Sequence, residues 1–297
     1  MSESEPVTVR TEDGWVLRGE AIAAGDGRGV AVLGHAMMAS RRTLDRPRGK
    51  GLASALAAEG LGVVMFDLRG HGESGPSARD GGAYTYDDFV LRDIPALVAF
   101  ARERFGGQRV ALVGHSLAAH AGLALAGVFP ERGPDAMVSI AGNIWLPSLE
   151  SSRLRGAAKA AFLRGWLAVT ERWGHFDPRP LRMGTDAVAL PYVRQFWQMW
   201  SEDRFGSIDG GTDYLTALGR VKIPVFSVAS EGDRLLAHPE SVARFMDLVG
   251  SARKASRVVR HGELGEKAPD HMGLVTRTSS APVWGQIARW LREELGR

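Results

Sequence analysis

Five short apolar segments alternate along the chain with segments that have helical spacing. The apolar segments have the length of a β-strand and lie at residues 30–33, 62–66, 110–113, 136–140 and 225–229. The helical segments lie at residues 51–59, 87–104, 117–128, 241–249 and 282–295. Strands that are apolar on both faces and alternate with helices belong to a parallel sheet covered by helices on both sides. The sequence therefore predicts an α/β fold with a mostly parallel central sheet.

The composition fits this class and excludes several others. With 297 residues, 44% of them hydrophobic, the chain can bury a large apolar core. It has no cysteine, which excludes disulfides, iron–sulfur ligation and a thiol nucleophile. The net charge of +3 is too small and too dispersed to indicate nucleic-acid binding. No His and carboxylate cluster at metal spacing appears, so we expect neither a metal nor another cofactor.

Two features bear on membranes and location. Residues 110–130 carry no formally charged side chain and nearly reach the length of a membrane span. They contain two histidines and a serine, and their period changes midway, so we interpret them as a strand followed by a buried helix. The chain starts with acidic residues where a secretory signal would be basic. We therefore expect a cytoplasmic protein without stable membrane insertion.

Two local patterns refine the expected elements. Alternating segments at residues 7–9 and 15–17, joined by a turn at 11–14, predict a β-hairpin at the start of the chain. Pro95 lies inside the predicted helix 87–104. Because proline lacks an N–H and clashes with the preceding turn, this helix should be kinked or should start later.

About eighty residues separate the strand that ends near Ala141 from the strand that starts near Val221, far more than an ordinary connection. We interpret residues 143–220 as an insertion and residues 1–142 and 221–297 as the core domain. The insertion holds five of the eight tryptophans, at positions 145, 166, 173, 197 and 200. Two apolar patterns within it predict amphipathic helices: Leu154, Ala158, Phe162, Trp166, Val169 and Trp173, and then Tyr192, Phe196 and Trp200.

A serine stands between small residues where a predicted strand runs into a predicted helix, at Gly114-His115-Ser116-Leu117-Ala118. A serine hydroxyl is a weak nucleophile unless it is held exposed beside a base. A tight strand-to-helix turn does this and directs backbone N–H groups at the developing oxyanion. Such a turn needs small residues two before and two after the serine, as Gly114 and Ala118 are. The motif alone is equally compatible with Ser116 acting only as a helix cap.

This segment resembles the G-x-S-x-G nucleophile elbow of the α/β-hydrolase fold superfamily, with alanine in place of the last glycine. His35-Ala36 is similar to the family's His-Gly at the end of a strand. The segment from Asp67 to Ser74 resembles its D-x-R-G-x-G-x-S turn, which we expect to be tied by local hydrogen bonds of Asp67, Arg69 and Ser74.

The resemblance runs from about residue 30 to the end of the chain, apart from the insertion. It implies an α/β-hydrolase fold in which a helical cap is inserted after the sixth strand. It also implies an oxyanion hole made by the backbone N–H groups of Met37 and Leu117. His35 is then expected to order its loop rather than to transfer protons.

A serine nucleophile needs a base and an acid that orients the base, which follow it in this family in the order acid, then histidine. The turn Ser230-Glu-Gly-Asp233 is similar to the family's G-x-x-D, which makes Asp233 the expected acid, with Glu231 as the alternative. His271 lies just before the C-terminal helix, where the family's histidine lies, and His261 is the alternative base. His115 and His120 are expected to pack behind the nucleophile.

These expectations combine into one function. We expect a serine esterase or lipase-like hydrolase that cleaves a carboxylic ester, or a related acyl bond, of a small and largely apolar substrate through an acyl-enzyme. Other reactions of the same triad remain open: thioester hydrolysis, acyl transfer, carbon–carbon bond hydrolysis and perhydrolysis. So does a binding protein that has kept the fold without the reaction. The oligomeric state is not predicted.

Overall fold

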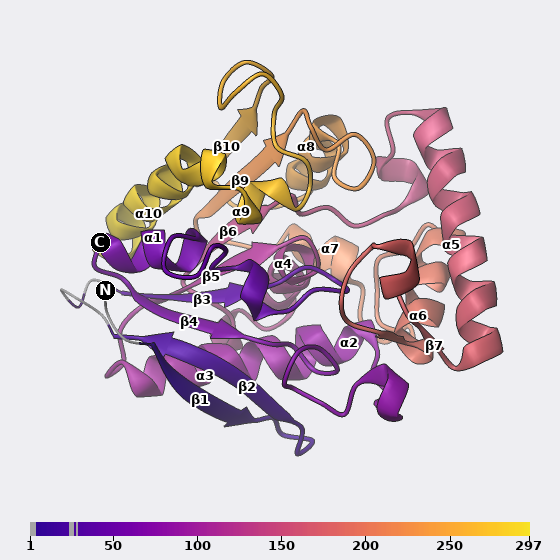
Figure 1. The fold of residues 1–297 in the computed structure, drawn as a ribbon, viewed down its shortest axis with the longest axis horizontal. Coiled ribbons are helices and arrows are strands. Elements are labelled where there is room, and N and C mark those ends of the chain that lie inside the picture. The colour runs from indigo at the N-terminus through magenta and orange to yellow at the C-terminus, as the bar shows by residue number, and fades with distance from the viewer. Residues whose placement is uncertain (1–3, 24–26, 28) are drawn as a thin grey trace.

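The computed structural model of the protein describes residues 4–23, 27 and 29–297, so the first three residues of the acidic start lie outside it. An eight-stranded sheet runs through the molecule in the order β1-β2-β4-β3-β5-β6-β9-β10 (Figure 1). The strands are β1 (Ser4–Arg10), β2 (Val16–Ile22), β3 (Val30–Gly34), β4 (Gly62–Phe66), β5 (Val110–His115), β6 (Ala136–Ile140), β9 (Val225–Ser230) and β10 (Lys254–Val259). The six strands from β4 to β10 are parallel, as predicted. The predicted hairpin is β1–β2, which joins the sheet by antiparallel pairing of β2 with β4.

Helices cover both faces of the sheet, since both faces of its central strands are apolar. The strand register places Phe66 and Leu112 on one face, where α3 (Ile94–Arg104) and α4 (Leu117–Val128) pack. Phe226 points to the other face, against Trp290 of α10 (Ala281–Leu295). There α10 packs on α1 (Leu52–Ala58). The core also contains α8 (Pro239–Asp247) and α9 (Gly273–Thr276).

The segment around Pro95 changes its helical geometry, as its sequence predicts. A short helix α2 (Tyr86–Asp88) leads into a π-helical turn, Phe89–Asp93, and α3 begins at Ile94 with Pro95 in its first turn. The π-helical turn runs directly into α3, and it lies where the ring of Pro95 would clash with the preceding turn of a regular α-helix.

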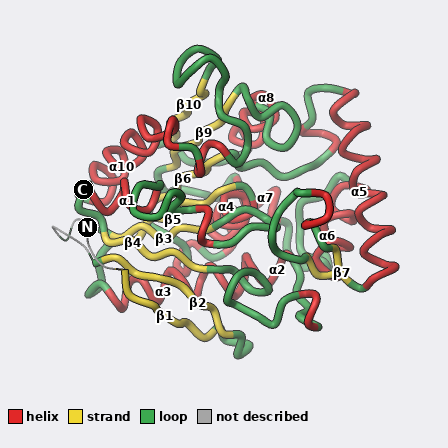
Figure 2. The backbone as a smooth tube through the Cα atoms, viewed as in Figure 1, coloured by secondary structure: helices red, strands yellow, loops and turns green. Residues whose placement is uncertain are grey.

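The insertion between β6 and β9 contains α5 (Arg153–Trp173), α6 (Leu190–Ser201), α7 (Tyr214–Leu218) and a small sheet of β7 (His175–Phe176) with β8 (Val188–Ala189). Helices α5 and α6 pack on each other at one end of the molecule, and α7 packs on α4. Figure 2 shows, in green, the loops that lie between the central sheet and α5 and α6. We call residues 143–220 the cap; its boundaries remain those predicted from the sequence.

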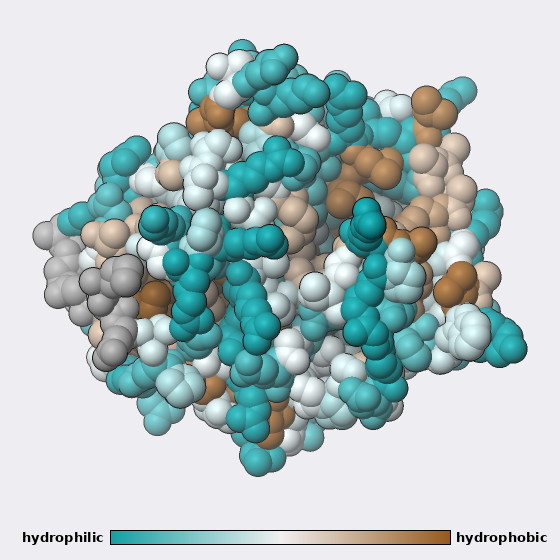
Figure 3. Space-filling view, viewed as in Figure 1, coloured by the Kyte–Doolittle hydropathy of each residue, from teal (hydrophilic) through white to brown (hydrophobic). Residues whose placement is uncertain are grey.

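The buried face of α5 differs from the predicted one. Leu154 and Trp173 were expected to face inward, yet their exposed fractions are 82% and 67%. Of the residues in the predicted pattern Trp166 is buried, and the other buried residues of α5 are Lys159, Leu163 and Thr170. The prediction of the buried face was therefore wrong at Leu154 and Trp173. Lys159 can be buried because it forms an ion pair with Glu150 and lies over the ring face of Trp145. A pattern of apolar residues reveals neither contact. Figure 3 shows hydrophobic side chains, in brown, at the surface on the side of the molecule where α5 lies.

The charge-free segment 110–130 forms β5 and the buried helix α4, in agreement with its interpretation. Within the part of the chain that the structure describes, no helix is both long enough and apolar enough to span a bilayer.

Candidate active site

Ser116 lies at the turn between β5 and α4 in a strained backbone conformation. Its φ of 52° and ψ of −106° are unusual for a residue other than glycine. The turn is held by hydrogen bonds from the Ser116 N–H to the carbonyl of Ile140 (2.9 Å) and from the N–H of Ala119 to the carbonyl of Ser116 (3.0 Å). The Ser116 side chain makes no capping hydrogen bond to α4, and Ser116 is partly exposed, whereas its neighbours in the turn are buried. These features argue against a role as a simple helix cap.

The close approach of α4 to the sheet explains the small residues of the motif. A Cβ atom on Gly114 would lie 2.5 Å from the backbone of Ala118 and Ala119, so no larger residue fits there. Ala118 stands where the family usually has glycine, and its methyl group faces Gly34 of β3. A Cβ on Gly34 would lie 2.4 Å from that methyl group. The space that the motif needs is therefore provided by Gly34 on the neighbouring strand.

Asp233 and His271 are brought together from distant parts of the chain. Asp233 follows β9, His271 precedes α9, and His271 Nδ1 donates to Asp233 Oδ2 at 2.5 Å. Asp233 Oδ1 accepts the N–H of Leu236 at 3.0 Å. Burial alone would raise the pKa of the Asp233 carboxyl, but these hydrogen bonds and the neighbouring imidazole outweigh it and lower the pKa below its usual value. The carboxylate is thus ionised and oriented on the imidazole.

The turn that carries Asp233 is held against the loop that carries His271. Ser230 stands at the family's usual glycine position, and its hydroxyl donates to the carbonyl of Pro269 at 2.5 Å. A Cβ on Gly232 would lie 2.3 Å from the carbonyl of Ala268, so the loops can be this close only with glycine. The substituted serine therefore fastens the two loops together.

His115, the residue before the serine, joins the His271 loop to the turn at Ser116. Its Nε2 donates to the carbonyl of His271 at 3.1 Å, and the two rings lie 4.9 Å apart. Burial, together with the nearby His271, places the pKa of His115 well below its usual value, so its ring is neutral. Among the residues that the structure describes, the Ser116 hydroxyl has no hydrogen-bond partner. The structure thus joins His271 to Asp233 directly, and to the Ser116 turn through His115.

The alternative acid and base are engaged elsewhere. The carboxylate of Glu231 accepts the N–H of His261 at 2.9 Å, and His261 Nδ1 accepts the N–H of Ala268 at 3.1 Å. His120 is hydrogen-bonded to the hydroxyl of Tyr86 at 2.9 Å, and burial lowers its pKa to about 3. None of these contacts involves His271 or Ser116.

The two N–H groups predicted to form the oxyanion hole lie at the ends of β3 and β5. Leu117 is the first residue of α4, so its N–H has no carbonyl partner within the helix. Met37 is half-buried in the loop after β3. His35 orders this loop: its Nδ1 donates to the carbonyl of Ala36 (2.8 Å) and its Nε2 accepts the N–H of Leu68 (3.0 Å).

The turn after β4 is tied by local hydrogen bonds, as expected. The Ser74 hydroxyl donates to the carbonyl of Asp67 at 2.7 Å, and the Arg69 guanidinium pairs with Asp93 at 2.7 Å. Asp67 also accepts the N–H of Arg41, at the end of the Met37 loop, at 2.7 Å. Sequence reasoning missed Arg41, since nothing in the local pattern indicates that it pairs with a carboxylate 26 positions away.

An aromatic cluster of the cap consists of Trp145, Phe162, Trp166, Tyr192 and Phe196, with ring centres about 6 Å apart. It is continuous with the Asp233 turn, because Trp145 Nε1 donates to the carbonyl of Leu236 at 2.8 Å. The indole N–H of Trp166 is buried without a protein partner in the described chain. The cluster is largely buried, and it reaches the turn that carries Asp233 through Trp145.

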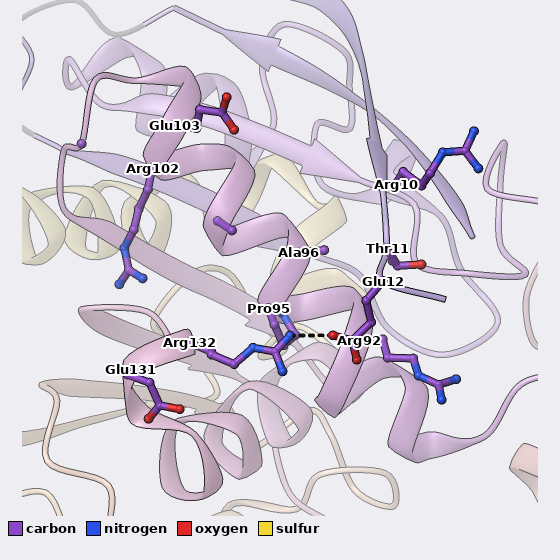
Figure 4. Close-up of a pocket in the computed structure, with 12 residues that line it drawn as sticks. Arg10, Thr11, Glu12, Arg92, Pro95, Ala96, Arg102, Glu103, Glu131 and Arg132 are labelled. Carbon is purple, nitrogen blue, oxygen red and sulfur yellow. Dashed lines mark hydrogen bonds and ion pairs between the residues drawn. The ribbon is translucent and has the colours of Figure 1, made fainter. Parts of the chain in front are cut away.

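Two surface grooves lie away from these residues. One, of about 850 Å³, runs between the β1–β2 turn and α3, and Figure 4 shows its lining, with Arg132 paired to Glu12. The other, of about 1280 Å³, lies beside β2 and α1 and is lined by four arginines, Arg41, Arg42, Arg46 and Arg48, among other residues. Neither is lined by Ser116, Asp233 or His271. In the described residues no group of three or more His, Asp or Glu side chains is arranged to hold a metal ion.

Comparison with solved structures places the whole chain in one fold. The esterase Pf2001 of Pyrococcus furiosus matches with a TM-score of 0.63 and 20% identity, over 99% of this chain and 94% of that chain. An esterase domain from Rhodothermus marinus matches with a TM-score of 0.61 and 17% identity, over 99% and 100%. A Paleococcus ferrophilus monoacylglycerol lipase matches with a TM-score of 0.60 and 16% identity, over 98% and 99%. At these identities the likeness shows a shared fold.

Sequence comparison identifies the family. No curated protein sequence matches this chain significantly. A family model described as the α/β-hydrolase fold matches residues 32–262, more than half of the chain. The chain therefore belongs to the α/β-hydrolase fold family.

Proposed function

We propose that this protein is a serine hydrolase that cleaves a carboxylic ester of a small, largely apolar substrate. The observation that carries the proposal is the strained, partly exposed Ser116 at a strand-to-helix turn, next to a loop whose His271 is hydrogen-bonded to Asp233. Strain at a residue other than glycine persists only where the surrounding structure holds it, and such residues cluster at functional sites.

In the proposed reaction His271 accepts the proton of Ser116 as the hydroxyl attacks the ester carbonyl. Because His271 Nδ1 donates to Asp233, its Nε2 carries the free lone pair that can take this proton. The ionised Asp233 stabilises the imidazolium that forms. His271 then gives the proton to the leaving alcohol, and water releases the acyl group from Ser116 by the same steps in reverse.

Charge on the carbonyl oxygen would be stabilised by the N–H groups of Met37 and Leu117. Leu117 begins a twelve-residue helix, whose N-terminus favours negative charge. Donors that are fixed before the reaction cost no reorganisation at the transition state, and one such donor is typically worth 10²–10³-fold in kcat.

The substrate class follows from the cap. The aromatic cluster beside the Asp233 turn suits an acyl or aryl group rather than a sugar or a charged peptide. The solved structures that share the fold are named as esterases and a monoacylglycerol lipase. These names support an ester bond as the target of this chain.

The test measures hydrolysis of p-nitrophenyl esters of increasing acyl length by the wild type and by Ser116→Ala. We expect activity with a maximum at one chain length, and a loss of several orders of magnitude in kcat for the variant. A fluorophosphonate probe should label the wild type and not Ser116→Ala. A folded wild type that neither turns over any ester nor is labelled would contradict the proposal.

A further inference from the structure

The cap contacts the Met37 loop through residues 184–186, directly beside the predicted oxyanion donor. Met38 has a φ of 61°, in the left-handed region that residues other than glycine seldom occupy. Its carbonyl oxygen accepts two N–H groups of the cap, from Thr185 at 2.9 Å and from Asp186 at 3.2 Å. The peptide between Met38 and Ala39, two peptide units after the one that carries the Met37 N–H, is therefore held by the cap and not by the core alone.

Gly184 makes this contact possible. A Cβ atom at this position would lie 2.3 Å from the carbonyl oxygen of Met38 and 2.6 Å from its Cβ. The cap backbone and the loop backbone are thus in direct contact, so a movement of residues 184–186 is passed to Met38 without an intervening side chain.

The carboxylate of Asp186 fixes the same segment to the core. Its Oδ1 accepts the N–H of Gly72 at 2.7 Å, and its Oδ2 accepts the hydroxyl of Thr185. Gly72 belongs to the turn after β4, in which Asp67 also holds the end of the Met37 loop through the N–H of Arg41. Asp186 therefore joins the cap to the turn that supports the loop from the other side.

We propose that Asp186 is a positioning residue for the oxyanion hole: it holds cap residues 184–186 against Met38 and so orients the N–H of Met37. This inference rests on the proposed function. It implies that the hole is complete only while the cap is seated on the Met37 loop. Because oxyanion stabilisation acts in the transition state and not on the bound ester, loss of Asp186 should lower kcat with little change in KM.

The test compares Asp186→Ala and Asp186→Asn with the wild type. We expect Asp186→Ala to lower kcat for p-nitrophenyl esters about tenfold or more with KM nearly unchanged. Asp186→Asn should stay within about threefold of the wild type, because its amide oxygen can still accept the Gly72 N–H. Gly184→Ala adds a Cβ atom 2.3 Å from the Met38 carbonyl oxygen and should lower kcat in the same way. It replaces Asp186→Ala if that variant does not fold.

Asp177→Ala is the matched control, because Asp177 also joins the cap to the core, through an ion pair with Arg79 at 2.5 Å, but does not contact Met38. It should keep wild-type kcat. If Asp177→Ala loses as much kcat as Asp186→Ala, the effect is general loosening of the cap and the inference is wrong.

A second measurement reports on the hole itself. A thionoester places sulfur, a poorer hydrogen-bond acceptor, where the oxyanion would form, so the ratio of kcat/KM for an ester and its thionoester measures the contribution of the hole. Asp186→Ala should lower this ratio, whereas a purely structural defect lowers both rates equally. An unchanged ratio, or a kcat within twofold of the wild type, overturns the inference. If the wild type itself hydrolyses no ester and no probe labels Ser116, the proposed function fails instead.

Discussion

At the scale of single residues, the site depends on a backbone conformation that is unfavourable in isolation. A residue other than glycine at the dihedral angles of Ser116 costs about 1–3 kcal/mol. The hydrogen bond to the carbonyl of Ile140, on the neighbouring strand β6, holds the turn in place. The sheet thus holds the backbone of Ser116 in its strained conformation, and the hydroxyl is left free for a reaction partner.

The pair of Asp233 and His271 makes the first residue-scale prediction. Asp233→Asn should leave the fold intact but lower kcat about 10³–10⁴-fold, because an asparagine that donates to Nδ1 imposes the wrong tautomer on the imidazole. The measurement is kcat for a p-nitrophenyl ester near neutral pH. Despite its burial, the pKa of the Asp233 carboxyl is lowered by hydrogen bonds and the neighbouring imidazole, so the wild-type carboxylate is ionised at this pH.

Glu231→Gln is the matched control for this prediction. Glu231 is two residues from Asp233 on the same turn, and its carboxylate accepts the backbone N–H of His261. A glutamine oxygen can accept the same hydrogen bond, so kcat should stay within about twofold of the wild type. A larger loss with Glu231→Gln than with Asp233→Asn would identify Glu231 as the acid.

How far the site could be predicted differs from one residue to the next. The order of the motifs and the family resemblance favoured Asp233 and His271 over Glu231 and His261, and the structure joins Asp233 and His271 by a hydrogen bond. Their catalytic roles stay a prediction. The two departures from the family pattern, Ala118 and Ser230, could not be interpreted from their own neighbourhoods. Each is accommodated by a residue far away in sequence, Gly34 in one case and Pro269 in the other.

At the scale of elements, the crossing of α4 over β3 and β5 yields a prediction on stability. Gly34→Ala would add a methyl group 2.4 Å from the methyl group of Ala118 and should cost about 1–3 kcal/mol in the free energy of unfolding. Ala118→Gly removes the clash but lowers helix propensity by about 1 kcal/mol. The free energy of unfolding of the double variant, measured with urea, should therefore exceed the value expected from adding the two single changes by about 1–2 kcal/mol.

Gly165→Ala serves as the comparison for that cycle. Gly165 lies in the middle of α5 with no atom within 4 Å of the position of an added Cβ. The same glycine-to-alanine change should stabilise the protein there by about 0.5–1 kcal/mol, because only the backbone entropy changes. Strictly additive free energies in the Gly34–Ala118 cycle would show that the two residues do not compete for one space.

Helix α5 shows why the existence of a helix was easier to predict than the face that it buries. The spacing of apolar residues predicted a helix, and α5 exists, but many of its positions are alanine, which fits either face. Its orientation is set by Lys159 and Trp166, one of which is charged. A pattern that assigns charged residues to solvent predicts the wrong rotation of this helix about its axis, because it turns Lys159 outward. The carboxylate that pairs with Lys159, on Glu150, lies outside the helix and so outside the pattern.

At the scale of the whole molecule, the carboxylate of Glu150 is one of the groups that join the cap to the core. Glu150 lies between β6 and α5, and its Oε2 accepts Lys159 Nζ at 2.5 Å. Its Oε1 accepts Arg155 Nε and the hydroxyl of Ser241 on core helix α8, each at 2.9 Å. Burial by itself would raise the pKa of Glu150. These partners outweigh burial and lower the pKa from 4.5 to about 2.

The lowered pKa sets the pH range in which this junction stabilises the fold. A carboxyl whose pKa is lower in the folded than in the unfolded protein stabilises the fold fully above the unfolded value, near 4.5, and progressively less as the pH falls toward 2. Glu150→Gln should therefore lower the free energy of unfolding by about 1–3 kcal/mol at pH 7, and the difference from the wild type should shrink between pH 4.5 and 3. Urea unfolding followed at several pH values measures both effects.

Glu171→Gln separates this effect from the loss of any glutamate in the cap. Glu171 pairs with Arg194 of α6 at 3.2 Å, but both side chains are about half exposed, so this change should cost less than about 0.5 kcal/mol at any pH. Because Glu150 binds Ser241 of α8 and Trp145 binds the carbonyl of Leu236, the cap is fastened on the side of the site that carries Asp233. A gap between wild type and Glu150→Gln that stays constant from pH 3 to 7 would show that the carboxylate charge does not hold this junction.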